Sequence, residues 1–249
     1  MNALVHAVGH ELPYQRMMVN SINSFYVNNP LLVGEVVTYV ICDDPTLDLT
    51  YLNSNVKVVR VDKPSYNYFK FGIGLERMVN YVFYKWEIFA NPMFRKIDNL
   101  LYMDVDTEVA GDVSELFSGK YNPGIYMADE DKNWLLEQGE EFSNSVRYCN
   151  AGVMFMTPKK LNQKDDMFVS LFNDLVGTAG KHKFMFADQC AINHVLGREE
   201  KYREIWKVLP PEYNFFHRTA CPRIPTSDLA KIIHHVGANK DYELKYIKE

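Results

Sequence analysis

Two aspartates one residue apart, Asp104 and Asp106, are the residues of this sequence whose spacing first suggests chemistry. They follow an apolar run at residues 100–103 that has the size of a buried strand. Ligands of open α/β sheets bind beyond the carboxyl ends of the strands. Two close carboxylates repel each other unless a cation such as Mg²⁺ or Mn²⁺ neutralises them. The alternative is a polar turn that closes the strand, and the dipeptide spacing alone favours that turn.

The segments around this pair predict an α/β fold. Strands are expected at residues 3–8, 33–41, 56–61, 100–103, 124–127, 148–156 and 232–236, and helices at 12–26, 75–89 and 168–175 and from residue 186 onward. The order strand, helix, strand at the start of the chain is typical of a parallel sheet built from βαβ units. We find no internal repeat, low-complexity tract or linker, so residues 1–249 are interpreted as one domain.

A second acidic pair, Asp43 and Asp44, follows the strand predicted at residues 33–41. It competes with Asp104 and Asp106 as a candidate site. Pro45 and Thr46 come next, and this composition is typical of a turn that opens a helix. We therefore assign Asp43 and Asp44 a capping role.

Composition excludes several classes of protein. The chain is 47% hydrophobic and 24% charged, as in ordinary globular proteins, and its net charge of −5 provides no general attraction to nucleic acid. No apolar stretch approaches the ~20 residues that a membrane span needs, and the first ten residues lack the basic region of a signal peptide. The four cysteines are widely spaced and form no CxxC pair, which argues against a thiolate zinc site. A cytoplasmic enzyme with free thiols is expected.

Five segments, taken in order, resemble the motifs of glycosyltransferase family 8. They are residues 101–106 (LYMDVD), 150–153 (NAGV), 188–189 (DQ), 209–214 (LPPEYN) and 233–240 (IHHVGANK). Each segment alone is a weak signal, but the ordered set spans most of the chain. The resemblance implies a GT-A fold, which is a mixed, mostly parallel sheet flanked by helices. It also implies a nucleotide-binding part at about residues 1–110 and a part for sugar and acceptor at about 111–249.

The resemblance implies a metal site. In this family the two aspartates and a C-terminal histidine hold Mn²⁺ against the diphosphate of the donor. By the pattern H-x-x-G-x-x-K, the histidine is His234, with Gly237 and Lys240 completing the motif. An imidazole with two carboxylates suits Mn²⁺, or Mg²⁺, better than Ca²⁺. The alternative is that His234 and His235 are structural histidines.

The remaining site residues are also implied by the resemblance. Lys240 matches the lysine that meets the donor phosphates and would stabilise the leaving diphosphate. Lys85 resembles a basic residue that contacts both donor sugar and phosphate, although a solvated helix lysine is the alternative. The residues expected to bind the donor sugar or to take part in catalysis are Asn150, Ala151, Gly152, Gly237, Asp188 and Gln189. His6 and Val8 stand on the first strand, where the family reads uracil and ribose.

The implied reaction moves a hexose, glucose or galactose, from a UDP-sugar to an acceptor hydroxyl on a glycan or other molecule, with retention of anomeric configuration. A double displacement would need Asp188 or Gln189 as nucleophile, and an amide is a poor one, so we favour front-face return. Departures from the family pattern lie at residues 7–10 (AVGH), where the first strand usually ends in polar residues, and at Asp241, which follows Lys240. No basic amphipathic tail indicates membrane docking.

Three other interpretations are considered. A haloacid dehalogenase-like phosphatase also uses two aspartates one residue apart, but its motif needs Thr or Val where this chain has Glu108. A sugar-nucleotide-binding protein without catalysis is the non-enzyme alternative, and metal-dependent turnover would exclude it. An inverting transferase on the same fold would be revealed by the anomeric configuration of its product. The oligomeric state, the sugar and the acceptor are not determined by the sequence.

Overall fold

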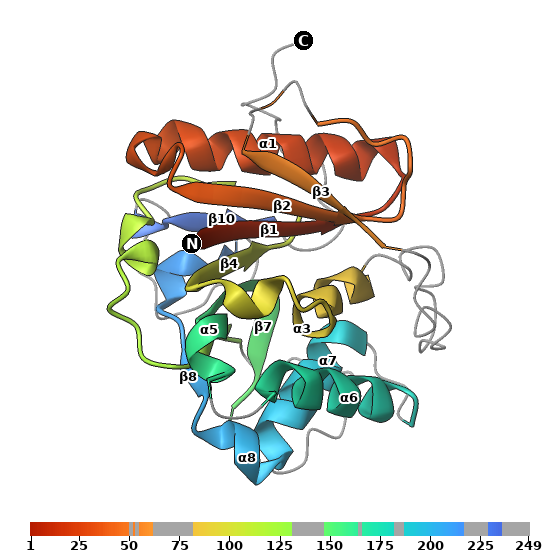
Figure 1. Ribbon diagram of the computed structural model, residues 1–249. Helices are drawn as coiled ribbons and strands as arrows, with labels where there is room; N and C mark the ends of the chain where they lie inside the picture. The colour runs from red at the N-terminus through yellow and green to blue at the C-terminus, as the bar shows by residue number, and fades with distance from the viewer. Residues whose placement is uncertain are drawn as a thin grey trace.

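A computed structural model describes residues 1–49, 52, 55–61, 82–130, 147–163, 166–181, 187–216 and 229–235. Its centre is a seven-stranded sheet (Figure 1). Along the sheet the strands are β3 (Val56–Arg60), β2 (Val36–Cys42), β1 (Asn2–Val8), β4 (Asn99–Met103), β7 (Cys149–Met156), β6 (Ile125–Asp129) and β8 (Trp206–Val208).

One strand of this sheet, β7, runs against the others. It pairs antiparallel with β4 and with β6, whereas the pairs β1–β2, β1–β4, β2–β3 and β6–β8 are parallel. The mixed, mostly parallel sheet of the GT-A type is thus confirmed. The reversal has a consequence for the site. The amino end of β7 lies at the same edge as the carboxyl ends of β4 and β6, because Val153 pairs with Met103.

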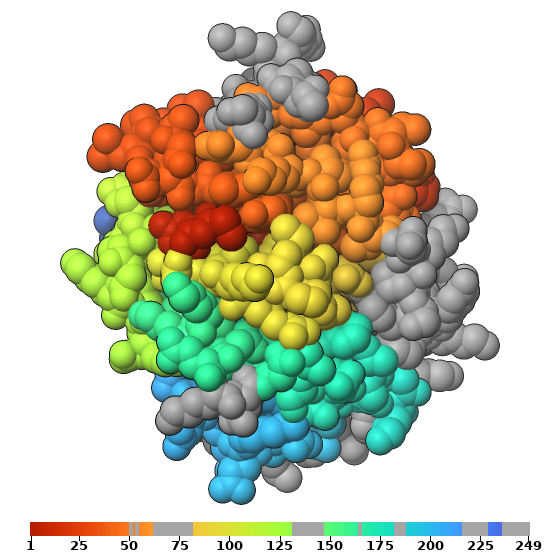
Figure 2. All heavy atoms as spheres, in the orientation of Figure 1, coloured from red at the N-terminus to blue at the C-terminus, as the bar shows by residue number. Residues whose placement is uncertain are grey.

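Helices cover both faces of the sheet. Side chains alternate along β1, so that Val5 packs in a cluster with Phe89 and Phe168, while Leu4 packs with Phe25. Phe25 belongs to α1 (Leu12–Asn28), Phe89 to α3 (Glu87–Ala90) and Phe168 to α6 (Met167–Ala179). Helix α1 therefore covers one face, and α3 and α6 cover the other. On the face shown in Figure 2, successive parts of the chain form bands, from orange at the top through yellow and teal to blue at the bottom.

A second, three-stranded sheet lies beside the first. It consists of β5 (Thr107–Val109), β10 (Ile232–His234) and β9 (Phe215–Phe216), with β10 in the middle. The remaining helices are α5 (Pro158–Leu161), α7 (Ala187–Arg198) and α8 (Glu200–Arg203). Single 3₁₀ turns occupy Pro30–Leu32, Phe83–Trp86, Phe94–Lys96, Ser114–Phe117 and Pro211–Tyr213.

Most predicted elements are present within two or three residues of the expected bounds. The helix expected at 12–26 is α1, which has Pro13 in its first turn and ends before Pro30. The expected helix 75–89 is described only from residue 82 onward, as a 3₁₀ turn followed by α3. No helix opens at Asp43 and Asp44 in the described residues, where a turn replaces the expected helix start. The assignment of nucleotide binding to residues 1–110 stays a prediction.

No helix in the described part of the chain is both long enough and apolar enough to cross a membrane. Cys42, Cys149 and Cys190 are buried free thiols.

Candidate metal and sugar site

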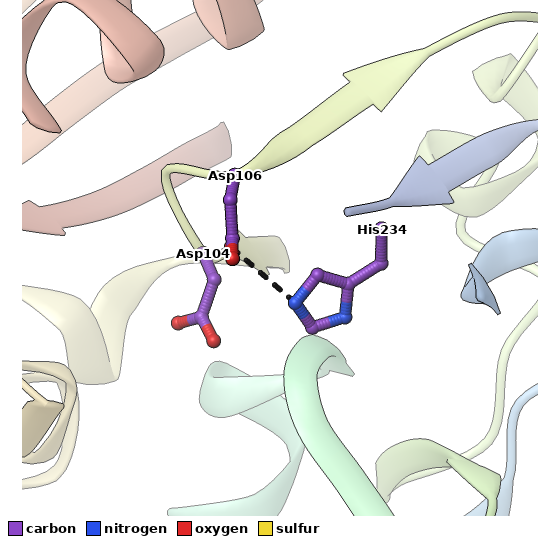
Figure 3. A group of neighbouring side chains, drawn as sticks. All are labelled: Asp104, Asp106 and His234. Atoms are coloured by element: carbon purple, nitrogen blue, oxygen red, sulfur yellow. Dashed lines mark ion pairs between the residues drawn. The ribbon is translucent and has the colours of Figure 1, made fainter. Parts of the chain in front are cut away.

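Asp104, Asp106 and His234 meet at the carboxyl edge of the main sheet. One potential ligand atom from each lies within 4.8 Å of the other two. Figure 3 shows Asp104 and Asp106 on the turn after β4 and His234 at the end of β10, with an ion pair of 3.3 Å from His234 Nε2 to Asp106 Oδ1. Two carboxylates and an imidazole are donors that Mn²⁺ accepts. The three residues therefore fit a divalent cation of this kind.

Strand pairing brings His234 to the aspartates across 128 residues of sequence. The turn at Asp106 leads directly into β5, and β5 pairs antiparallel with β10, so that Thr107 lies opposite His234. The backbone N–H of His235 also donates to the carbonyl of Asp106, at 2.9 Å. Sequence reasoning missed β5, which is three residues long, and with it this connection.

Gly152 contacts both Asp104 and His234 and helps to position them. Its carbonyl accepts a hydrogen bond of 2.7 Å from the backbone N–H of Asp104. A Cβ on Gly152 would lie 1.9 Å from His234 Cε1 and would overlap the imidazole ring. The glycine of the NAGV segment is thus required because the imidazole packs directly on the β7 backbone.

Lys85 is buried and joins Asp104 to Asp188. Its Nζ lies 3.1 Å from Asp104 Oδ1 and 2.7 Å from Asp188 Oδ2, and it donates to the carbonyl of Ala151 at 3.4 Å. Only 3% of the side chain is exposed, so the alternative of a solvated helix lysine is wrong. Lys85 comes from the 3₁₀ turn Phe83–Trp86, and Asp188 from the first turn of α7.

The electrostatics of the cluster follow from these distances. Burial by itself would lower the pKa of His234, but the carboxylate of Asp106 raises it above its usual value. Burial would likewise raise the pKa of Asp106, but His234 and Lys85 hold it below its usual range. Despite burial, Asp104 and Asp188 raise the pKa of Lys85. Three carboxylates facing one lysine and one histidine leave the site net negative in either protonation state of His234, which favours a cation.

Asn150, Ala151 and Gln189 form the other side of the site. Gln189 Oε1 accepts from the backbone N–H of Ala151 at 3.0 Å, and its Nε2 donates to the hydroxyl of Tyr148 at 2.8 Å. Asn150 Oδ1 accepts from the backbone N–H of Gly152 at 2.8 Å. The amides are therefore oriented by the β7 backbone, next to the aspartates.

Two residues of this arrangement were missed from the sequence. Glu130 follows β6 and accepts from Asn150 Nδ2 at 3.2 Å and from Gln189 Nε2 at 2.9 Å. Asn214 lies between Asn150 Oδ1, at 3.1 Å, and His234 Nδ1, at 3.0 Å. A signal existed for both, because Glu130 directly follows a strand parallel to β4, and Asn214 ends the LPPEYN segment.

The other predicted residues divide into two groups. His6 and Val8 lie in the interior of β1, 0% and 1% exposed, and Val8 packs with residues of α1. Burial lowers the pKa of His6 to about 4, against smaller opposing contributions from the Met103 backbone and the charge of Asp104. Their contact with uracil or ribose stays a prediction.

Gly237 and Lys240 lie outside the described residues. His235 forms an ion pair of 3.6 Å with Glu108.

The sequence matches the model of glycosyl transferase family 8 over residues 12–241. No curated protein sequence matches the chain significantly.

Solved structures of glycosyltransferases share the fold. The galactosyltransferase LgtC, in complex with donor and acceptor sugar analogs, has a TM-score of 0.64 and 14% identity, over 97% of this chain and 89% of that one. Mouse xyloside xylosyltransferase 1 has a TM-score of 0.59 and 16% identity, over 94% and 96%. The bifunctional glycosyltransferase WbbM has a TM-score of 0.62 and 16% identity; 96% of this chain aligns with it but spans only 46% of its length.

Proposed function

Because the chain belongs to glycosyl transferase family 8, we propose that this glycosyltransferase moves a hexose from a UDP-sugar to an acceptor hydroxyl, with retention, in a reaction that depends on a divalent cation. The observation that carries the proposal is the meeting of Asp104, Asp106 and His234 at the carboxyl edge of the sheet. A Mn²⁺ or Mg²⁺ held there would bind the donor diphosphate and neutralise its charge as it leaves.

The residues around the cluster support a role in holding the donor. Lys85 provides a buried cation at the junction of the metal side and the sugar side, 2.7 Å from Asp188. A fixed positive charge there favours the phosphate charge that develops when the glycosidic bond breaks. Asp188 offers a carboxylate oxygen to the hydroxyls of a hexose. Asn150 is proposed to bind the sugar from its sequence motif alone. Lys240 is proposed as a second phosphate contact from its sequence motif alone.

The hydrogen bonds of Gln189 and Asp188 favour front-face return over double displacement. The amide oxygen of Gln189 is already held by the Ala151 N–H, and Asp188 is paired with Lys85. Both interactions reduce the availability of these oxygens for attack on an anomeric carbon. We propose that Gln189 and Asp188 position the sugar, while the departing phosphate accepts the proton of the acceptor hydroxyl.

The test is UDP release from a panel of UDP-sugars, with Mn²⁺ or Mg²⁺ and then with EDTA. Hydrolysis of one donor, abolished by EDTA, is the expected result and identifies the sugar. Release that continues in EDTA would contradict the metal requirement, and no release from any UDP-sugar would contradict the proposed donor class. Once an acceptor is found, NMR of the product gives its anomeric configuration, and inversion would exclude front-face return.

A further inference from the structure

A line of polar side chains, buried except for the half-buried Glu130, joins the sugar side of the site to the candidate metal ligand His234. Glu130 accepts from Asn150 Nδ2 at 3.2 Å, and Asn150 Oδ1 accepts from Asn214 Nδ2 at 3.1 Å. Asn214 Oδ1 lies 3.0 Å from His234 Nδ1. Asn150, Asn214 and His234 are 4%, 2% and 4% exposed, so water does not compete freely for these bonds. The four residues come from four separate segments of the chain.

The donor and the acceptor of each hydrogen bond along this line are fixed, because the groups at its start can act in only one of the two roles. A carboxylate only accepts hydrogen bonds, and a backbone N–H only donates them. Asn150 therefore turns its NH₂ to Glu130 and its oxygen to the N–H of Gly152, at 2.8 Å. That same oxygen needs a donor from Asn214, which consequently presents its own oxygen to His234. Asn214 therefore favours a proton on Nδ1 of a neutral His234 ring, against the carboxylate of Asp106, which favours a proton on Nε2 when no cation is bound.

We propose that Glu130, Asn150 and Asn214 form a directed hydrogen-bond chain that favours the Nδ1–H tautomer of His234, in which the Nε2 that faces Asp106 carries a lone pair for a divalent cation. The inference rests on the proposed function for the identity of that ligand. The geometry is consistent with it, since Nε2 is the ring nitrogen that lies 3.3 Å from Asp106. Glu130 and Asn214 are thus positioning residues for the metal site.

The reversed chain would be unfavourable for metal binding. Glu130 and the Gly152 N–H orient Asn150 together, so the direction of the chain is lost only when Asn214 itself is replaced. A hydrogen on Nε2 would block the lone pair that a cation needs. Partners that orient a ligating histidine are typically worth about 10–100-fold in metal affinity.

The first experiment measures binding of Mn²⁺ alone, without donor, by electron paramagnetic resonance. Asn214→Leu removes the acceptor for Nδ1 and is expected to weaken Mn²⁺ binding about 10–100-fold. Glu130→Gln replaces the charged acceptor of Asn150 Nδ2 by a neutral amide, while the Gly152 N–H still orients Asn150, so a smaller loss of up to about tenfold is expected. Glu35→Gln is the matched control, because Glu35 is exposed on the turn before β2. A thermal melt of each variant verifies folding.

The second experiment reads the tautomer itself. In ¹⁵N-labelled, metal-free protein, at a pH where the ring is neutral, the nitrogen shifts of His234 are expected to show Nδ1–H. His234→Gln identifies the resonances. Asn214→Leu is expected to increase the Nε2–H form, which a merely structural role would not do. Glu130→Gln is expected to increase it to a smaller extent, because the Gly152 N–H still orients Asn150.

The outcomes separate this inference from the proposed function. Mn²⁺ affinity and tautomer unchanged in both variants would overturn the directed chain while leaving a metal-dependent transferase intact. An Nε2–H tautomer in the wild-type protein would also overturn it. An Nδ1–H tautomer that the variants change, in a protein that binds no Mn²⁺, would support the chain and refute the metal dependence of the proposed function.

Discussion

Strands β2 and β4 flank β1, and each is followed at once by two aspartates. After β2, the side chains that donate hydrogen bonds to the two carboxylates are neutral, and one of them, Thr46, is a near neighbour in the chain. Asp44 accepts from the backbone N–H and the hydroxyl of Thr46, at 2.8 and 2.6 Å, and from Gln15 at 2.9 Å. Asp43 accepts from the hydroxyl of Tyr84 at 2.7 Å. The bonds from Thr46 lower the pKa of Asp44, as expected for a carboxylate that stabilises a turn.

After β4, the partners are distant in sequence and ionisable. Asp104 is paired with Lys85 and Asp106 with His234, and Lys85 also reaches Asp188. Among the described residues, the group that could hold a metal ion comprises this pair and not the pair after β2. The comparison shows that two carboxylates at the end of a strand are a candidate site when charged side chains from distant segments converge on them, and a turn when neutral groups satisfy them.

The largest expected effect is on the β4 pair. Asp106→Ala removes one ligand and should lower turnover by more than about 100-fold, since even residues that only support metal ligands contribute about 10–100-fold. Steady-state UDP release with Mn²⁺ measures it, and a thermal melt verifies that the fold survives. Activity near that of the wild type would mean that Asp106, like the pair after β2, is not a metal ligand, and would contradict the proposed metal site.

Lys85→Met sharpens the comparison through stability. Removing the ammonium leaves Asp104 and Asp188 without their shared cation. The loss should fall near the lower end of the roughly 3–5 kcal/mol typical of a broken buried pair, because the side chain of Asp104 is 29% exposed. Urea unfolding without metal measures it, and added Mn²⁺ should restore part of the loss. Lys201→Met, at an exposed ion pair, is the control, with under about 1 kcal/mol expected. Equal losses in the two variants would refute the buried charge network.

Gly152→Ala tests the packing of His234 against β7. The added Cβ would overlap the imidazole, so the ring must move and Mn²⁺ affinity should fall about 10–100-fold. Gly177→Ala in α6 is the matched control, because a Cβ there meets no atom within 4 Å and alanine suits a helix interior. Calorimetric titration with Mn²⁺ measures both variants. Unchanged affinity in Gly152→Ala would mean that His234 does not contribute to binding.

The smallest effect is expected for the β2 pair. Asp44→Ala removes the hydrogen bonds from Thr46 and Gln15 and should cost about 1 kcal/mol of unfolding free energy, because these partners are partly solvated. Turnover and Mn²⁺ affinity should match those of the wild type. A large loss of turnover in this variant, with the fold intact, would show that both acidic pairs take part in the reaction.

Local patterns were sufficient for much of the fold. The apolar run before Asp104 predicted β4, and the apolar spacing along residues 12–26 predicted the helix that buries Ile22 and Phe25. These predictions succeeded because the periodicity of a strand or helix is visible in neighbouring residues. The three-residue strand β5 carries no such signal, so the pairing of β5 with β10 could not be predicted.

The ordered motifs predicted that Asp104, Asp106 and His234 belong together, and the structure brings them within 4.8 Å. No motif assigned a role to Glu130 or Asn214. Their importance arises from hydrogen bonds between segments that lie far apart in the chain.

The sequence by itself determined the strand and helix order, the family, and the residue types that could bind a cation. Only the tertiary structure decided that Lys85 is a buried bridge rather than a solvated lysine and that Gly152 must lack a side chain. The physical reason is the sequence separation over which the interactions act. Local propensities act between neighbours in the chain, whereas the charge and hydrogen bonding of a site depend on which distant segments the folded backbone places beside it.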